Sequence, residues 1–243
     1  MRRGSSRLVL FLAPAVLALG IILLAAVELW HSHDDARRNG EEAAGNLVHI
    51  LAEQTERTFQ AVDFTLLGIR DALTIAPDTL ENDPRFRATL KERLKALPYV
   101  RALFVIGPDG FITHDTDYPT TPRVSLADRP YFKAHQYDPD LGLRVAHPLR
   151  SRSVKVWFVS FSRRINRPDG SFGGIVVAAV EPRYFEHFYG GLSVGENSII
   201  SLLLRDGILL ARSPEPEDVI GKSFADSEPF LSHLAASPAG VYW

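Results

Sequence analysis

The sequence predicts an α+β protein with an N-terminal transmembrane helix, a long stalk helix and two related modules with antiparallel sheets, the second incomplete. Three observations lead to this prediction: an apolar run near the N-terminus, a heptad seam after it, and a sequence block that occurs twice. The two copies contain Asp-Gly pairs 97 residues apart (Gly110 to Gly207) and prolines 99 apart (Pro130 to Pro229). Short solenoid repeats run to about 20–50 residues, so this spacing indicates tandem modules.

The apolar run from Leu8 to Trp30 has no charge before Glu28. At about 1.5 Å per residue it is roughly 35 Å long as a helix, enough for a bilayer core of about 30 Å. A cleavable signal peptide is the alternative, but its apolar region is typically shorter, about 7–15 residues. Three arginines precede the run, which predicts a cytoplasmic segment over 1–7, a transmembrane helix over 8–30 and an exported remainder.

The stalk helix is predicted over 34–76. Its apolar positions follow the 4-3-4-3 spacing of a coiled coil from Val48 to Leu73, with Thr55 as the one interruption, and Pro77 ends the pattern. A second apolar edge at Leu47 and Leu51 widens the stripe. The seam therefore fits two uses equally, packing on the protein's own sheet and contact with a second copy in a homodimer.

The first module is predicted over 77–192 and the second over 193–243. A helix is expected at Pro84–Ala96 after an Asn-Asp start signal, and a short one at Tyr184–Tyr189. Alternating apolar residues and Gly-containing turns predict the strands. The expected strands are Val100–Ile106, Phe111–Thr113, Leu143–Pro148, Val154–Ile165 and Phe172–Val180, then Ile199–Leu204 and Ile208–Ala211. Fewer strands follow the second copy than the first, so we expect the second module to be truncated.

Composition narrows the function. There are no cysteines, which excludes disulfides and Cys-ligated zinc. The net charge of −2 gives no general attraction to nucleic acid. The sequence contains no Gly-x-Ser-x-Gly, His-Glu-x-x-His or phosphate-binding glycine-rich motif, so we expect no enzyme activity and no cofactor. The run His114–Asp117 could supply oxygen ligands for calcium, but capping of a turn is the favoured interpretation.

The order of these elements resembles the double Cache family, the tandem PAS-like extracytoplasmic sensor regions of bacterial receptors. The segment Asp128-Arg129-Pro130-Tyr131-Phe132 is similar to the one that opens a helix beside the ligand pocket in that family. The segments Trp157–Ile165 and Pro168–Gly174 are similar to a strand pair in sensors attached to diguanylate cyclases and histidine kinases. The resemblance implies a receptor in the bacterial inner membrane, with its bulk in the periplasm and its output domain outside this chain.

The resemblance also implies a ligand site. Amino-acid-binding members have Arg-x-Trp-Tyr where this chain has Arg129-Pro130-Tyr131-Phe132, and Val124 replaces an earlier tyrosine of that pattern. The strands predicted between 143 and 180 contain no Asp or Glu that could hold an ammonium group. An arginine fork fits a carboxylate, so a small organic anion is expected rather than an amino acid.

The predicted ligand-binding residues are those of the Arg129 segment and of one face of the strand at 154–165, where aromatic bulk alternates with two cations. They are Arg129, Tyr131, Phe132, His147, Lys155, Trp157, Phe161 and Arg163. Alternatives remain for several. Arg129 could pair with Asp128 or cap a helix, the strand face could be core, and His147 could be satisfied locally. The main competing function is a membrane-anchored module that binds protein, with a pocket filled by its own side chains, and an anchored enzyme of unknown type is a third possibility.

Overall fold

The computed structural model describes residues 5–75, 83–152, 154–192, 198–214, 219–234, 237 and 240, without the side chains of residues 5–16, 18 and 229. The chain divides into two compact units. One comprises Met1–Glu53 with Gly240–Trp243, and the other comprises Gln54–Ala239. The predicted boundaries at 77, 192 and 193 stay predictions.

The first unit consists of most of helix α1, Ser5–Ile75. Ion pairs one turn apart line this part of the helix, such as Arg37–Glu41 at 3.1 Å and Arg38–Asp34 at 2.9 Å. Within the part of the chain that the structure describes, no helix has the length and apolar character needed to cross a membrane. The side chains of residues 8–16 and 18, in the predicted span, lie outside that part.

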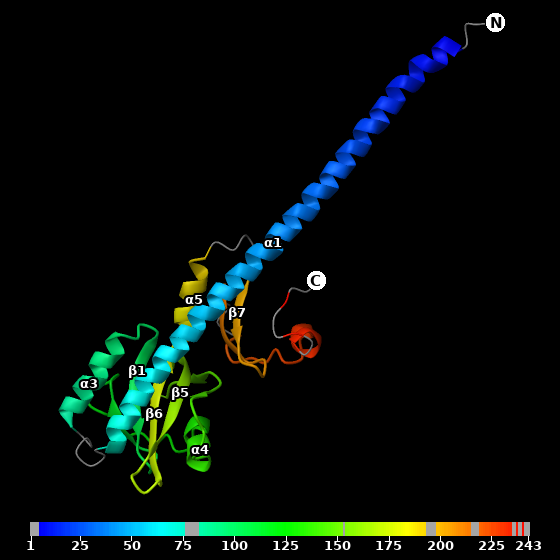
Figure 1. Ribbon diagram of the computed structural model, residues 1–243. Helices are drawn as coiled ribbons and strands as arrows, with labels where there is room; N and C mark the ends of the chain where they lie inside the picture. Colours follow the sequence, from blue (N-terminus) through cyan, green and yellow to red (C-terminus); the bar gives the residue numbers. More distant parts are fainter. Residues whose placement is uncertain are drawn as a thin grey trace. The chain divides into compact units, whose positions relative to one another are not determined.

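The C-terminal end of α1 belongs to the second unit and packs on the sheet of this chain. Val62, Leu66, Ile69 and Leu73 are buried, at 0–7% exposed. The ring of Phe59 meets Phe161 of the sheet edge to face, with centroids 4.7 Å apart. This half of the predicted seam is therefore intramolecular, because its apolar positions are used by the protein's own core (Figure 1).

The second unit is built on a six-stranded antiparallel sheet in the order β2-β1-β6-β5-β3, with β4 paired to β5. The strands are β1 Val100–Ile106, β2 Ile112–Asp115, β3 Arg144–Val145, β4 Leu149–Arg150, β5 Trp157–Asn166 and β6 Phe172–Val180. Helices α3 (Pro84–Lys95), α4 (Pro130–Tyr137) and α5 (Pro182–Gly190) accompany them. The predicted α+β class, antiparallel pairing and long N-terminal helix are confirmed.

The two faces of the sheet have different partners. On β5, odd-numbered residues face α1: Phe161 meets Phe59 and Arg163 forms an ion pair with Asp63. Even-numbered residues face α4, and Ser162 Oγ lies 3.0 Å from His135 Nε2. The even-numbered side also holds a core cluster that includes Phe104, Tyr131 and Phe158.

Two predicted strands differ from the observed ones by more than two residues at one end, and three others differ by one or two residues. The strand expected at Leu143–Pro148 is divided into β3 and β4. The strand expected from Val154 begins at Trp157, because Lys155 has φ 61° in a tight turn closed by Ser151 N donating to Val156 O at 2.9 Å. A residue in the left-handed region cannot continue a strand.

The second copy of the repeated block forms a two-stranded sheet from β7 (Ile200–Leu203) and β8 (Leu209–Ser213). A short π-helical segment, η1 (Pro229–His233), follows at the position that α4 occupies in the first copy. Both hairpins were expected from their Asp-Gly turns, and both are present.

Candidate functional site

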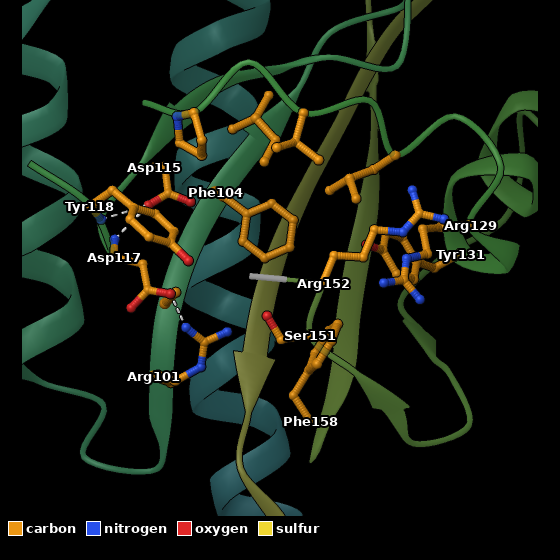
Figure 2. A pocket seen from close by; sticks show the side chains of 15 residues that line it. Arg101, Phe104, Asp115, Asp117, Tyr118, Arg129, Tyr131, Ser151, Arg152 and Phe158 are labelled. Carbon is orange, nitrogen blue, oxygen red and sulfur yellow. Dashed lines mark hydrogen bonds and ion pairs between the residues drawn. The ribbon is translucent and has the colours of Figure 1, made fainter. Parts of the chain in front are cut away.

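A cavity of about 130 Å³ lies on the α4 side of the sheet, between the strands and the segment that connects β2 to α4. Its charged residues occupy opposite sides: Figure 2 shows Arg129, Tyr131 and Arg152 on one side and Arg101, Asp115, Asp117 and Tyr118 on the other. The lining residues are Arg101, Ala102, Phe104, Ile112, Asp115, Asp117, Tyr118, Pro122, Val124, Leu126, Arg129, Tyr131, Ser151, Arg152 and Phe158.

Arg129 and Tyr131 reach the cavity from the start of α4. Arg129 occupies the N-cap position with extended backbone, and its side chain makes no capping hydrogen bond. Its Nη2 donates to Arg150 O at 3.2 Å, whereas its buried Nε has no hydrogen-bond partner among the described residues. Tyr131 is 1% exposed, and burial raises the pKa of its phenol to about 12, so it stays neutral.

The alternative in which Arg129 pairs with Asp128 is not what the structure contains. Asp128 forms an ion pair with Arg152 instead. Arg152 also donates from Nη1 to Ser125 O at 3.0 Å, which ties the turn after β4 to the segment before α4. Arg129 has no ion-pair partner among the described residues, so its charge is available to a ligand.

Asp115 and Asp117 form the acidic side of the cavity, at the end of β2. Asp115 is 4% exposed, and its Oδ1 accepts hydrogen bonds from the backbone N of Asp117 at 2.6 Å and of Tyr118 at 3.1 Å. The predicted turn-capping role of this run is confirmed. Burial raises the pKa of Asp115, opposed by the Tyr118 hydrogen bond and by Arg87 and Arg101. Asp115 thus caps a turn and also borders the cavity.

Arg101 enters the cavity because β1 contains a bulge. The pairing of β1 with β6 shifts between Val100 and Ala102, and the neighbours Arg101 and Ala102 both line the cavity. In a regular strand they would point to opposite faces. Arg101 forms an ion pair with Asp117, and its Nε lies 3.3 Å from Glu181 Oε1, at the start of α5. The charge of Asp117 is thereby neutralised. Of the two described carboxyl groups that line the cavity, Asp115 is the one without an ion pair.

The rest of the wall is mainly apolar, including Phe104, Leu126 and Phe158, each at most 7% exposed. Tyr118 adds a hydroxyl whose buried oxygen has no hydrogen-bond partner among the described residues. A buried donor without a partner costs about 1–3 kcal/mol. The free polar atoms of Tyr118 and Arg129 therefore point to a polar molecule in the cavity.

Of the predicted site residues, only Arg129 and Tyr131 line this cavity. Phe132 is 1% exposed and packs edge to face on Phe172, with ring centroids 5.4 Å apart. His147 lies at the surface, with Nε2 2.6 Å from Asp206 Oδ2 of the second hairpin. Local satisfaction, the alternative for His147, is what the structure shows.

The strand face chosen from the sequence does not meet the cavity. Phe161 and Arg163 contact α1, where Arg163 Nη2 donates to Asp63 Oδ2 at 2.8 Å. Lys155 and Trp157 line a different cavity, described below. Phe158, on the opposite face of β5, lines the first one. Alternation correctly groups residues by face, but it does not tell which face a helix covers.

Comparison with known proteins places this fold. A family model described as a histidine kinase sensor domain, similar to double Cache domains, matches residues 182–243. The crystal structure of the extracellular domain of rpHK1S-Z16, assigned as a histidine kinase, is 34% identical, with a TM-score of 0.75 over 82% of this chain and 80% of that one. No match was found among the curated proteins.

More distant structures share the fold. The ligand-binding domain of the Pseudomonas aeruginosa PAO1 chemoreceptor PctC, in complex with GABA, is 14% identical with a TM-score of 0.59 over 78% of this chain and 82% of that one. That of the Pseudomonas fluorescens chemoreceptor CtaA, in complex with L-serine, is 16% identical with a TM-score of 0.53 over 76% and 79%. With the extensive identity to the rpHK1S-Z16 domain, the chain belongs to the double Cache family of extracellular sensor regions.

Proposed function

We propose that this chain is the ligand-sensing portion of a membrane-bound signal-transduction receptor, and that its first cavity binds a small organic anion through Arg129. The observation that carries the proposal is the state of Arg129, which lines the cavity without an ion-pair partner among the described residues and with a buried, unpartnered Nε. A guanidinium in this state matches a carboxylate in charge and in geometry.

Asp115 favours a ligand that also carries an ammonium group. The preference for a plain anion depended on the absence of acidic residues from the strands between 143 and 180, but the acidic side of the cavity comes from the end of β2. Among the described residues that line the cavity, Asp115 and Arg129 are two opposite charges without ion pairs, and they lie on opposite sides of it (Figure 2). A small amino acid would satisfy both, and the GABA and L-serine complexes of PctC and CtaA support the same chemistry.

The test is isothermal titration calorimetry with GABA, L-serine and succinate as ligands. The parent chain and three full-length variants are titrated in parallel. Arg129→Gln should weaken a carboxylate ligand by about tenfold to a hundredfold, the equivalent of about 1.5–3 kcal/mol for a hydrogen bond to a charged group. Asp115→Asn should weaken amino acids and leave succinate unchanged. Arg123→Gln changes an exposed arginine that lies over the Phe111 ring, outside the cavity, and serves as the matched control.

The pH dependence gives a second readout. An ammonium group binds the ionised form of Asp115, whose pKa is raised in the free protein. Amino-acid affinity should therefore fall as the pH is lowered through that raised pKa, and Asp115→Asn should remove this dependence. Binding that survives unchanged in Arg129→Gln would mean that Arg129 does not hold the anion, whereas the absence of binding by any such ligand would favour a protein-binding module.

The wider receptor context is also proposed. The signal would pass to a histidine kinase or diguanylate cyclase output, with the apolar segment 8–30 as the inner-membrane anchor and a homodimer formed through the free part of the α1 seam. Val48, a position of this seam, is 65% exposed on α1. Sedimentation of the full chain in detergent should give a dimer that Val48→Glu weakens, and a monomeric parent would contradict this arrangement.

A further inference from the structure

A second cavity, of about 230 Å³, lies between the turn after β4, the start of α5 and the second copy of the block. The first module contributes Arg150, Lys155 and Trp157, and α5 with its N-cap contributes Arg183 and Glu181. Ile220, which is 4% exposed, comes from the segment after β8. The cavity therefore has walls from the predicted first module and from the second copy of the repeated block.

The chemistry of the walls is that of a donor-rich site. Arg150, Lys155 and Arg183 provide three cations, whereas Glu181 and Glu186 provide two carboxylates. Glu181 already lies 3.3 Å from Arg101, so its charge is partly compensated. The cavity wall thus carries more cations than carboxylates, which favours an anionic occupant.

Trp157 supplies both an apolar surface and an unused donor. The guanidinium of Arg150 lies 5.0 Å from the ring centroid of Trp157, within cation–π range. The indole Nε1 is buried and has no hydrogen-bond partner among the described residues. An indole nitrogen can only donate, so an acceptor on a bound molecule would satisfy it, while the ring and Ile220 would cover an apolar part.

The conformation of Lys155 is a further indication. Its φ of 61° lies in the left-handed region, where glycine is free of strain and a lysine costs about 1 kcal/mol or more. Lys155 N donates to Ser151 O at 3.1 Å, which holds this turn at the edge of the cavity. Strained residues gather at functional sites, and here the strained residue brings a positive charge.

We propose that this second cavity is a binding site for a small organic anion with an apolar portion, separate from the Arg129 site and shared by the predicted first module and the second copy of the block. Lys155 and Arg183 hold the anionic group, and Trp157 and Ile220 contact the apolar portion. A molecule bound there stabilises one arrangement of these two parts, because it contacts both.

The experiment is a fluorescence titration of the full chain with cyclohexanecarboxylate, which does not absorb where tryptophan does. The chain has three tryptophans, so the Trp30→Phe/Trp243→Phe background leaves Trp157 as the one reporter. We expect a saturable change in its emission and none with the uncharged cyclohexylmethanol. Lys155→Gly, which suits the left-handed backbone, and Arg183→Gln should each weaken binding about tenfold or more.

Two controls separate this site from the first. Lys133→Gln alters an exposed cation of α4, outside both cavities, and should leave the titration unchanged. Arg129→Gln should also leave it unchanged, so the result does not depend on the proposed function of the first cavity. The proposal is overturned if Trp157 gives no saturable response, if Lys155→Gly and Arg183→Gln bind like the parent, or if Arg129→Gln abolishes the response.

Discussion

In the first copy of the repeated block, Gly110 has φ 83° and its carbonyl accepts a hydrogen bond from Leu126 N at 2.7 Å. In the second copy, Gly207 has φ 82° and accepts from Phe224 N at 2.8 Å. Each glycine follows an aspartate whose Oδ1 accepts from the backbone two residues on, at 3.1 Å for Asp109 and 3.3 Å for Asp206. The turn is thus repeated almost atom for atom.

The residues that precede the helical segment have the same backbone hydrogen bond in both copies. The charged side chain, however, is present only in the first copy. Arg129 N donates to Leu126 O and Ser227 N donates to Phe224 O, both at 3.0 Å, so Ser227 occupies the position of Arg129. Arg129 lines the first cavity, whereas serine brings no charge to the equivalent place. The comparison teaches that the backbone of the block is a scaffold, and that ligand chemistry depends on single side chains placed on it.

The largest effect we expect comes from the turn of the first copy. A Cβ at Gly110 would lie 2.4 Å from Ala127 Cβ and 2.9 Å from its Cα, in a backbone conformation that alanine disfavours. Gly110→Ala should lower the free energy of unfolding by about 3 kcal/mol or more. A Cβ at Gly207 would lie 2.5 Å from Ala225 N, so Gly207→Ala should destabilise the second hairpin. Gly142→Ala, with no neighbouring atom within 4 Å, is the control for thermal and urea unfolding. Equal stability of Gly110→Ala and Gly142→Ala would mean that the turn is not a fixed scaffold.

The second largest effect concerns the histidine that ends each copy. His135 is fully buried, and burial, helped by Arg144, Arg163 and Arg164, lowers its pKa to about 4 from 6.5 despite the Ser162 hydrogen bond. The unfolded chain therefore binds a proton between these values that the folded chain does not. Stability should fall by about 3 kcal/mol from about pH 7 to about pH 4 through this residue.

The measurement is urea unfolding as a function of pH. In His135→Gln, the unfolding free energy should lack the part of its pH dependence that comes from His135. The glutamine keeps a hydrogen-bonding group near Ser162. His233→Gln changes the partly exposed histidine of the second copy and should retain the parent's slope. Identical pH profiles for the parent and His135→Gln would show that His135 is not held neutral by burial.

Much of the scaffold could be predicted from the sequence, because it depends on local chemistry. Gly-containing turns and apolar alternation located the strands, and β6 was predicted at its observed bounds, Phe172–Val180. The helix α3 begins at the expected Pro84, after Asp83 Oδ1 accepts from Arg85 N at 2.8 Å. Both signals act within a few residues and are therefore visible in one sequence.

The cavity could be predicted only in part, because its residues meet through long-range packing. Arg101 depends on a bulge, which shifts a strand's alternation by one residue without a sequence signal. The face of β5 that α1 covers is decided by the whole core, so the sequence does not reveal that Phe161 and Arg163 contact α1. The aspartates at the end of β2 were interpreted as capping a turn, and their place on the cavity wall opposite Arg129 depends on the packing of the sheet.

The smallest effect we expect concerns the ion pair between His147, which lies between β3 and β4, and Asp206 of the second hairpin. Asp109 and Asp206 both cap their turns, but Asp206 Oδ2 also lies 2.6 Å from His147 Nε2, and this hydrogen bond lowers the pKa of Asp206. Both groups are exposed, so the pair should contribute at most about 0.5–1 kcal/mol. Asn can still accept at the turn, so Asp109→Asn and Asp206→Asn should differ by no more than this amount, and the difference should shrink as salt is added. Thermal unfolding of the two variants measures this difference. A larger difference that salt does not change would mean that the second turn depends on Asp206 in a way that the first does not depend on Asp109.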